Sequence, residues 1–263
     1  MKKNPIGIFD SGVGGLSVLK EIIKILPEEN IVYFGDTARV PYGTKSKKII
    51  IKYAEEDVEF LLKYKPKLIV IACHTVSSYA SEYLKRKFKN IEFIDVIKPS
   101  VEEAIKITNN KKIGVIGTTG TISSGKYQKL LKKNGISVYS KDCPLFVPLV
   151  EEGWFENEVT QKIVEIYLSD MKKNGIDTII LGCTHYPYLK NAIEKFFGEN
   201  VKIIDASYKV AIEIKKFLER KNLKKQKGKG KIYLYFSDIG ISVKRAIRFL
   251  FGKNIKYKLA KNV

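Results

Sequence analysis

Two of the three cysteines in the chain stand at equivalent points, each directly after a short apolar stretch and before a segment with helical periodicity. Cys73 follows Leu68–Ala72, and Cys183 follows Thr178–Gly182. Parallel sheets present their ligands at this end of the strands. A helix N-terminus lowers the pKa of a thiol from its ordinary value of about 8.5, so a usable fraction of thiolate is expected at neutral pH. Each cysteine taken alone also fits a small buried residue at a strand end, and that is our interpretation of Cys143.

The two histidines of the chain both adjoin these cysteines. His74 follows Cys73, and His185 lies two residues after Cys183. A zinc site is one explanation, but the pairs lack the CxxC or HxxxH spacing that lets ligands converge, so we expect no metal. Acid–base support of the thiols is the second explanation, and it requires only proximity. A structural histidine with satisfied hydrogen bonds is the third.

Two glycine- or threonine-rich loops are candidates for binding an anion. Residues 10–15 (DSGVGG) precede a predicted helix, and the glycines let backbone N–H groups approach an anion closely. The counterpart, residues 117–121 (GTTGT), offers N–H groups and hydroxyls, with Thr118 among them. Neither loop matches the glycine patterns of nucleotide-binding sites, so we expect a carboxylate ligand and not a nucleotide.

The elements that must position these residues alternate along the whole chain, with short β-branched stretches followed by longer amphipathic ones. This pattern predicts an α/β fold with parallel-rich sheets. The predicted strands are Ile6–Phe9, Ile31–Phe34, Leu68–Ala72, Glu92–Ile94, Ile113–Ile116, Ser137–Tyr139, Thr178–Leu181, Val201–Ile204 and Ile232–Phe236. Apolar residues three and four apart predict helices that include Lys45–Tyr64, Ser123–Lys133 and Thr160–Lys173.

The sequence also contains a weak internal repeat. Residues 6–12 (IGIFDSG) resemble residues 113–119 (IGVIGTT), and residues 68–75 (LIVIACHT) resemble residues 178–185 (TIILGCTH). Asp10 and Cys73 are 63 positions apart, and their counterparts Gly117 and Cys183 are 66 positions apart. We therefore expect two similar Rossmann-like α/β domains. Residues 1–98 together with 210–263 are predicted to form the first domain, and residues 99–209 the second.

The composition is that of a globular protein with a strong positive charge. Of 263 residues, 44% are hydrophobic and 29% are charged, and no apolar run approaches eighteen residues, which argues against disordered and membrane-spanning classes. The 48 Lys and Arg against 28 Asp and Glu give a net charge of +20, which would suit a nucleic-acid binder. Five arginines among the 48 argue against that reading, because nucleic-acid recognition favours the guanidinium group, and thermophily also enriches lysine. The densest run, Lys221–Lys231, is predicted to be a solvated linker.

The cysteine count and the first residues bear on location. Three cysteines do not form a disulfide framework and fit a reducing compartment. Residues 1–5 lead directly into a predicted strand and not into the apolar core of a signal peptide. We expect a cytoplasmic protein without a membrane partner.

The ordered set of motifs resembles a known family, the cofactor-independent glutamate racemases of peptidoglycan synthesis, within the wider aspartate/glutamate racemase superfamily. The motifs extend over nearly the whole chain. They are IGIFDSGVGGLSVL (6–19), YFGDTARVPYG (33–43), ACHTVSS (72–78), IGVIGTTGTISSGKY (113–127), CPLFVPLVEEG (143–153) and LGCTHYPYL (181–189). The last motif separates glutamate racemases from their aspartate relatives, which usually carry an acidic residue after the Cys-Thr pair.

The resemblance implies an isomerase that interconverts L- and D-glutamate without a metal or pyridoxal cofactor and so supplies D-glutamate for cell-wall biogenesis and cell shape. It implies an interdomain cleft with Cys73 and Cys183 on opposite faces of the substrate α-carbon. It also implies auxiliary acid–base groups, namely Asp10, His185 and one or both of Glu151 and Glu152. The residues expected to bind the substrate are Asp10, Ser11, Tyr42, Gly43, His74, Thr75, Thr118, Thr184 and His185.

One residue departs from the family pattern. The family normally reads Ala-Cys-Asn-Thr, and this chain has His74 in place of the asparagine whose amide would bind the substrate. A neutral imidazole still offers one donor, but it is bulkier and can become a cation near neutral pH. Two alternatives stay open, a racemase or isomerase with another acidic substrate and a basic nucleic-acid-binding protein. We do not expect a nucleic-acid partner, and a homodimer is an open possibility.

Overall fold

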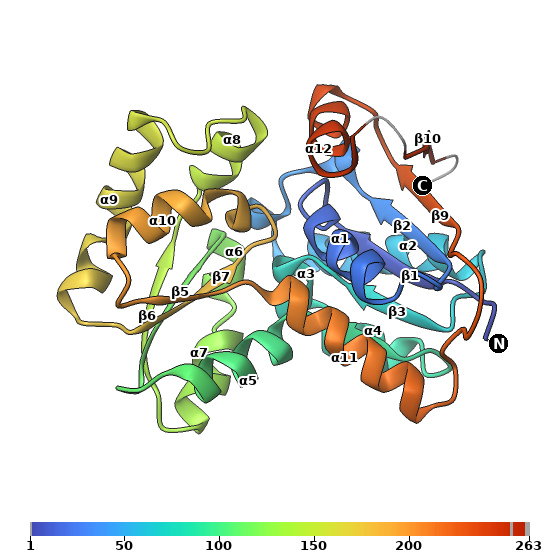
Figure 1. Cartoon of the computed structure of the whole chain (residues 1–263), viewed down its shortest axis with the longest axis horizontal. Coiled ribbons are helices and arrows are strands. Elements are labelled where there is room, and N and C mark those ends of the chain that lie inside the picture. The colour runs from blue at the N-terminus through green and yellow to red at the C-terminus, as the bar shows by residue number, and fades with distance from the viewer. Residues whose placement is uncertain (1, 253–254, 261–263) are drawn as a thin grey trace.

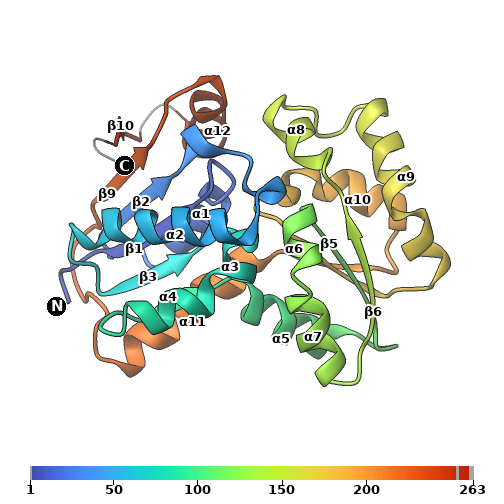
Figure 2. The same ribbon diagram turned by 180° about the vertical axis from the view of Figure 1, so that it is seen from behind.

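The computed structural model describes residues 2–252 and 255–260, which form two lobes, each built on a parallel sheet (Figures 1 and 2). The first lobe holds the sheet β10–β9–β2–β1–β3–β4, and the second lobe holds the sheet β6–β5–β7–β8. All strand pairs within both sheets are parallel. The strands are β1 (Ile6–Asp10), β2 (Ile31–Gly35), β3 (Leu68–Ile71), β4 (Phe93–Asp95), β5 (Lys112–Gly117), β6 (Ser137–Asp142), β7 (Thr178–Gly182), β8 (Lys202–Ile204), β9 (Ile232–Phe236) and β10 (Tyr257–Leu259).

The central strands form because their side chains are apolar on both faces. Every residue of β1, β2, β3 and β7 is buried, as expected of a parallel sheet covered by helices on both sides. The α/β fold and all nine predicted strands are confirmed, with ends that differ by three residues at most. The tenth strand, β10, was not predicted, because the three residues Tyr257–Leu259 are mostly exposed and carry no apolar run.

The helices cover both faces of each sheet. They are α1 (Leu16–Ile25), α2 (Lys47–Leu62), α3 (His74–Tyr79), α4 (Ser81–Lys87), α5 (Ile97–Ile107), α6 (Thr119–Ser123), α7 (Lys126–Lys133), α8 (Phe146–Glu151), α9 (Glu158–Lys173), α10 (Lys190–Phe197), α11 (Ala206–Arg220) and α12 (Ile241–Phe251), with 3-10 turns at Thr37–Arg39, Tyr42–Thr44 and Tyr186–Leu189. Side-chain caps begin two of the long helices, where Ser46 accepts a hydrogen bond from Ile49 N–H and Asn157 from Thr160 N–H.

One predicted helix starts later than expected. The periodicity predicted a helix from Ser123, but α7 begins at Lys126. Gly125 separates it from α6 by adopting a φ of 68°, a left-handed conformation that glycine tolerates and most residues do not. The break turns α6 away from α7 and leaves α6 beside the cleft between the lobes.

The C-terminal part of the chain returns to the first lobe. Strand β9 pairs with β2 in register from Ile31 to Gly35, and β10 adds to its outer side. The lysine-rich run 221–231 that leads to β9 is only partly a solvated linker. Its backbone is held by the buried Glu29–Lys67 ion pair, because Lys67 Nζ donates to the Leu223 carbonyl and Lys225 N–H donates to Glu29.

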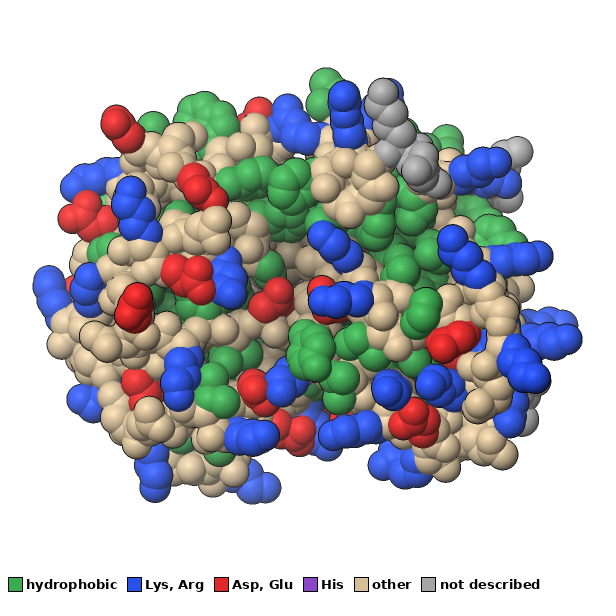
Figure 3. Space-filling view, viewed as in Figure 1, with side chains coloured by type: hydrophobic (Ala, Val, Ile, Leu, Met, Phe, Trp, Pro, Cys, Tyr) green, Lys and Arg blue, Asp and Glu red, His purple; other side chains and the backbone are tan. Residues whose placement is uncertain are grey.

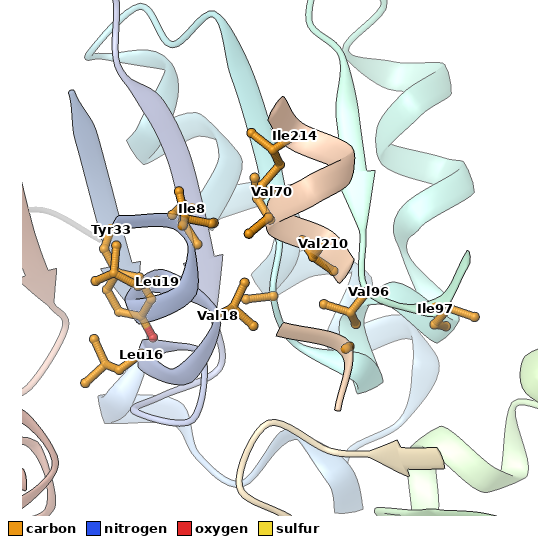
Figure 4. Close-up of a cluster of buried hydrophobic side chains, with 14 of the residues drawn as sticks. Ile8, Leu16, Val18, Leu19, Tyr33, Val70, Val96, Ile97, Val210 and Ile214 are labelled. Atoms are coloured by element: carbon orange, nitrogen blue, oxygen red, sulfur yellow. The ribbon is translucent and has the colours of Figure 1, made fainter. Parts of the chain in front are cut away.

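The main hydrophobic core continues from one lobe to the other. It lies between the first sheet, α1 and α11 (Figure 4). It extends along α5 to one face of the second sheet. Val18 of α1, Val70 of β3 and Val210 of α11 are all buried in it. The predicted domain boundaries at 98/99 and 209/210 therefore fall inside continuous helices, α5 and α11.

The surface carries its positive charge widely. In the view of Figure 3 the Lys and Arg side chains are scattered over both lobes with acidic side chains among them, and they do not gather into one stripe. Within residues 2–252 and 255–260, no helix has the length and hydropathy that a membrane crossing requires.

Candidate active site

A cavity of about 380 Å³ lies between the lobes, at the carboxyl ends of β1, β3, β5 and β7. This is the edge at which parallel sheets hold their ligands. Its lining comes from both lobes and comprises Ser11, Val40, Pro41, Tyr42, Gly43, Thr44, Cys73, His74, Thr75, Thr118, Thr119, Pro144, Val147, Pro148, Glu151, Cys183, Thr184 and His185. The two cysteines singled out by their position after apolar strands thus share one cavity.

Cys73 stands on the first-lobe wall, as the N-cap of α3. Its Sγ lies 3.5 Å from Ser11 Oγ on the β1–α1 loop. Burial raises the pKa of Cys73 to about 12, and the negative charge of Asp10 adds to the effect. The thiol is therefore protonated at neutral pH, contrary to the sequence-based expectation of a substantial thiolate fraction at this position.

Cys183 on the second-lobe wall has a cationic neighbour. Its Sγ lies 3.9 Å from Nδ1 of His185, and Nε2 of the same ring lies 3.5 Å from Oε1 of Glu151. Burial alone would lower the pKa of His185, but Cys183, Glu151 and Asp10 raise it to about 10. The imidazolium form therefore persists at neutral pH, with one N–H toward the sulfur.

The acidic candidates occupy different places. Glu151 lines the cavity, whereas the side chain of Glu152 is 72% exposed and lies 3.8 Å from Arg245 outside it. Asp10 is buried behind the wall, where it accepts hydrogen bonds from Gly12 N–H (2.9 Å) and Thr184 Oγ1 (3.3 Å). Burial raises the pKa of Asp10, although the charge of His185 opposes the rise.

Three threonine hydroxyls join the lobes at the back of the cavity. Thr75 Oγ1 of α3 lies 2.9 Å from Thr118 Oγ1 and 3.2 Å from Thr121 Oγ1, and the two second-lobe hydroxyls are 3.1 Å apart. Gly43 packs directly against Thr118, because a Cβ on Gly43 would lie 2.6 Å from Cβ of Thr118. Thr75, Thr118 and Gly43 are thus close enough to contact one ligand.

A network of buried charges holds Tyr42. Its hydroxyl donates to Asp36 and lies 3.4 Å from Oδ2 of Asp57. The Arg39 guanidinium pairs with both carboxylates and with Glu56. The tyrosine therefore contributes its ring and backbone to the cavity wall, while its hydroxyl is hydrogen-bonded to Asp36 behind the wall.

His74 is buried and makes its hydrogen bond to the opposite lobe. Its Nδ1 lies 2.8 Å from the hydroxyl of Tyr127 on α7, and the two rings are stacked. Burial lowers the pKa of His74 to about 3. The expectation that this side chain becomes a cation near neutral pH is therefore wrong, because desolvation by burial outweighs the opposing charge of Asp95.

The glycines of the β1–α1 loop allow the lobes to approach closely. A Cβ at Gly14 would lie 2.2 Å from Thr184 Oγ1 and 2.7 Å from His185 Nδ1. The loop was expected to bind an anion through its N–H groups. In the structure its Ser11 lines the cavity and its Gly12 N–H bonds the Asp10 carboxylate.

The sequence analysis missed several wall residues. Val40, Pro144, Val147 and Pro148 supply apolar surface, and only their place inside two of the quoted motifs could have drawn attention to them. It also gave no role to Tyr127, the last residue of the motif 113–127. In the part of the chain that the structure describes, no group of three or more His, Cys, Asp or Glu side chains is arranged to hold a metal ion.

Comparison with known proteins agrees with this geometry. A family model described as Asp/Glu/Hydantoin racemase matches residues 6–212. The glutamate racemase of Aquifex aeolicus (strain VF5) is 49% identical over 98% of both chains. The structure of glutamate racemase RacE1 from Bacillus anthracis superposes with a TM-score of 0.95 at 37% identity, covering 99% of this chain and 98% of that one.

A second solved structure contains a ligand. The glutamate racemase from Francisella tularensis subsp. tularensis SCHU S4, in complex with D-glutamate, superposes with a TM-score of 0.93 at 36% identity, covering 100% of this chain and 98% of that one. Sequence, fold and the pair of thiols in one cavity lead to the same assignment. The chain belongs to the Asp/Glu/hydantoin racemase family and, within it, to the glutamate racemases.

Proposed function

We propose that this glutamate racemase inverts the α-carbon of glutamate with two thiols, Cys73 and Cys183, one on each face of the substrate. One sulfur, as thiolate, removes the α-proton, and the electron pair of the broken C–H bond is held by the carbanion and its carboxylate. The other sulfur, as thiol, delivers its proton to the opposite face. The product is the other enantiomer, and the two thiols have exchanged protonation states.

The placement of the two sulfurs supports this division. They follow central strands of two different sheets, β3 and β7, and both line the cavity between the lobes. Inversion needs an acid and a base on opposite sides of one carbon, and residues from facing lobes meet that requirement. This shared cavity is the observation that carries the proposal.

The surroundings of the thiols suggest how the cycle begins. Cys73 has a pKa raised to about 12 by burial and by Asp10, so it starts as a proton donor. Cys183 has the His185 ring 3.9 Å from its sulfur, so a cation stands beside it. We assign Cys183 to proton removal from L-glutamate and Cys73 to proton removal from D-glutamate. Because enantiomers have equal free energies, kcat/KM must be the same in the two directions.

The auxiliary acid–base roles are proposed for His185, Glu151 and Asp10. His185 contacts the Cys183 sulfur and Glu151 lies at its other nitrogen, so this pair can take up and return charge as Cys183 changes state. Asp10 acts from behind the wall, through Thr184 and the charge of His185. We leave Glu152 out of the mechanism because its side chain faces solvent.

The cavity also suits the two carboxylates and the ammonium group of glutamate, the ligand seen in the Francisella tularensis relative. Hydroxyls of Ser11, Thr75, Thr118 and Thr184 and the donor of His74 are the proposed hydrogen-bond partners. The Tyr42–Gly43 segment adds backbone groups on the first-lobe side. D-glutamate then serves peptidoglycan synthesis, the general role of the family.

The experiment that tests the proposal is exchange of the α-proton of glutamate in deuterated water, without added cofactor. We expect deuterium at the α-carbon of both enantiomers from either starting enantiomer, and no comparable exchange with aspartate or small neutral amino acids. Exchange that requires added pyridoxal phosphate or a divalent metal would contradict the two-thiol mechanism. Faster exchange with another acidic amino acid would reassign the substrate.

A cytoplasmic location and a homodimer are two further proposals, which the exchange experiment does not test. A cytoplasmic location is supported by three buried cysteines that are all free, as a reducing compartment would leave them. A homodimer is a prediction, tested by light scattering coupled to gel filtration.

A further inference from the structure

Tyr127 is a buried tyrosine that the mechanism above does not use. It belongs to α7 of the second lobe and is 0% exposed. Its hydroxyl lies 2.8 Å from Nδ1 of His74, at the start of α3 in the first lobe. The ring centroids are 6.2 Å apart with an interplanar angle of 22°. The contact therefore crosses from lobe to lobe beside the residue that follows Cys73.

Two arrangements fit this contact, one with the tyrosine hydroxyl as donor and one with Nδ1–H of His74 as donor. The buried His74 ring is neutral, since burial lowers its pKa to about 3. A neutral imidazole has one N–H donor and one acceptor nitrogen. If the tyrosine hydroxyl donates to Nδ1, the single ring proton must be on Nε2.

We propose that Tyr127 is a positioning residue, which holds His74 as the Nε2–H tautomer so that the ring presents a donor to a substrate carboxylate. His74 lines the cavity, and with Nδ1 occupied by Tyr127, Nε2 is the ring nitrogen left for a ligand. The other tautomer would present a lone pair to an anion and repel it. This inference rests on the proposed function, because it assumes that the cavity binds glutamate.

The arrangement also fits a histidine at a position where the resemblance described above implies an asparagine. An asparagine amide accepts through its oxygen and donates through its nitrogen, so it can bond Tyr127 and a carboxylate at the same time. A histidine in the Nε2–H form offers the same pair of functions. Because the partner that selects the form is on the other lobe, the donor is set only while α3 and α7 are together.

The first measurement is the ring protonation of the histidines by nitrogen NMR of protein labelled with ¹⁵N-histidine. The chain has two histidines, so the spectrum contains two imidazole rings. His185, with its pKa raised to about 10, should show two protonated nitrogens at pH 7, and His74 should show one. We expect the His74 proton on Nε2, and its signal should shift when glutamate is added.

The second measurement uses Tyr127→Phe, which removes the hydroxyl and keeps the ring. We expect the His74 signals to move toward the Nδ1–H form or a mixture, with KM for glutamate raised about 10-fold and kcat changed less, as for the loss of one hydrogen bond to a charged group. Tyr139→Phe is the matched control, because Tyr139 is a partly buried tyrosine of the same lobe outside the cavity lining. It should leave both the spectrum and KM unchanged.

The outcomes separate this inference from the proposed function. An Nδ1–H form in the unmutated protein would overturn the inference, as would a Tyr127→Phe protein with unchanged His74 signals and KM. If Tyr127→Phe does not fold, the unmutated protein decides, since an Nε2 signal that glutamate does not shift contradicts a donor to substrate. An Nε2–H ring in a protein that neither binds nor racemises glutamate would instead refute the proposed function.

Discussion

The two thiols share a cavity but not an environment. Cys73 faces a serine hydroxyl and the charge of Asp10, whereas Cys183 faces an imidazolium supported by Glu151. In the proposed mechanism, a symmetric reaction is therefore performed by an asymmetric pair. The proposal uses this asymmetry to start Cys73 as the proton donor, and the equilibrium between the enantiomers is unchanged by it.

Replacement of either thiol by serine tests the two roles. Serine is a far weaker acid in the same position, so one proton transfer fails and racemisation should fall by about 10³-fold or more. With an analogue that carries a β leaving group, proton removal alone leads to elimination. Cys183→Ser should then still eliminate from the D-enantiomer, and Cys73→Ser from the L-enantiomer.

Cys143→Ser is the control for that pair. Cys143 is buried, is not part of the cavity lining, and lies 3.8 Å from the Lys141 carbonyl. This variant should racemise glutamate at a rate close to that of the unmutated enzyme. Equal elimination from both enantiomers by either cysteine variant of the site would rule out the two-base assignment.

The pKa of His185 predicts the alkaline limit of activity. If the imidazolium supports the Cys183 thiolate, activity should fall as pH rises through about 10. Glu151→Gln removes one of the groups that raise this pKa, so the alkaline limb of kcat/KM should move to lower pH. Glu152→Gln is the matched control on the neighbouring exposed residue. If the alkaline limb of kcat/KM stays at the same pH in Glu151→Gln, Glu151 does not set the pKa of His185.

His74 affects stability and not the pH profile of activity near neutrality. Its pKa is about 3 in the folded protein against an ordinary value of 6.5, so the unfolded chain binds the extra proton between these values. Stability should therefore rise with pH across that window and be lost on acidification. His74→Asn should remove this contribution, seen as a shallower fall of Tm between pH 6.5 and 3, while preserving or improving kcat/KM. A collapse of activity at pH 7 would show an obligatory role for the imidazole.

At the residue scale, the sequence predicted the pair of thiols and most of the wall but not the charge states. Apolar strands before Cys73 and Cys183 predicted where the sulfurs would lie. The pKa of each group depends on what the other lobe buries against it, and this is visible only after folding. Tyr127 illustrates the limit, because its role depends on a contact with a residue 53 positions away.

The β1–α1 loop packs closely against the second lobe. Its glycine at position 14 faces Thr184 and His185 of the other lobe with no space for a side chain. The glycine-rich pattern was interpreted as an anion cradle, and the structure shows a second reason for it. Close approach between two polypeptide segments favours glycine as strongly as close approach to a ligand does.

Gly14→Ala tests this element. The added methyl group must displace Thr184 or His185, and displacements of about 1 Å near a reacting centre can cost about 100-fold in rate, so we expect kcat/KM to fall to that extent with little change in Tm. Gly240→Ala is the control, because a Cβ there would meet only Asp238 Oδ2 at an ordinary distance of 3.6 Å. Full activity in Gly14→Ala would show that the loop and β7 need not pack this closely during catalysis.

The remaining elements show where sequence patterns fail. Strand β6 runs to Asp142 although its last three residues are polar, because it pairs with β5 along its full length and its outer edge faces solvent. Strand β10 pairs with β9 along its three residues. Edge strands gain their order from hydrogen bonds to a neighbour and need no apolar pattern of their own.

On the scale of the whole molecule, two helices connect the lobes through a shared core. Both α5 and α11 contribute buried residues, Val101 and Val210 among them, to the cluster that also contains Ile8 of β1 and Ile180 of β7. The sequence repeat predicted two halves, but it placed their boundaries inside these helices.

We expect the two lobes to move as rigid bodies when glutamate binds, with residues 1–98 and 210–263 in one body and 99–209 in the other. The reason lies in the threonine contact and in the His74–Tyr127 hydrogen bond, which join the lobes at the cavity, so that a shift of one lobe against the other changes the cavity. Crystal structures with and without glutamate should superpose within each body and differ by a rotation near the starts of α5 and α11. Because β9 pairs with β2, the C-terminal segment should follow the first body. Movement of that segment with the second body, or identical lobe positions in both structures together with fast turnover in the crystal, would refute this division.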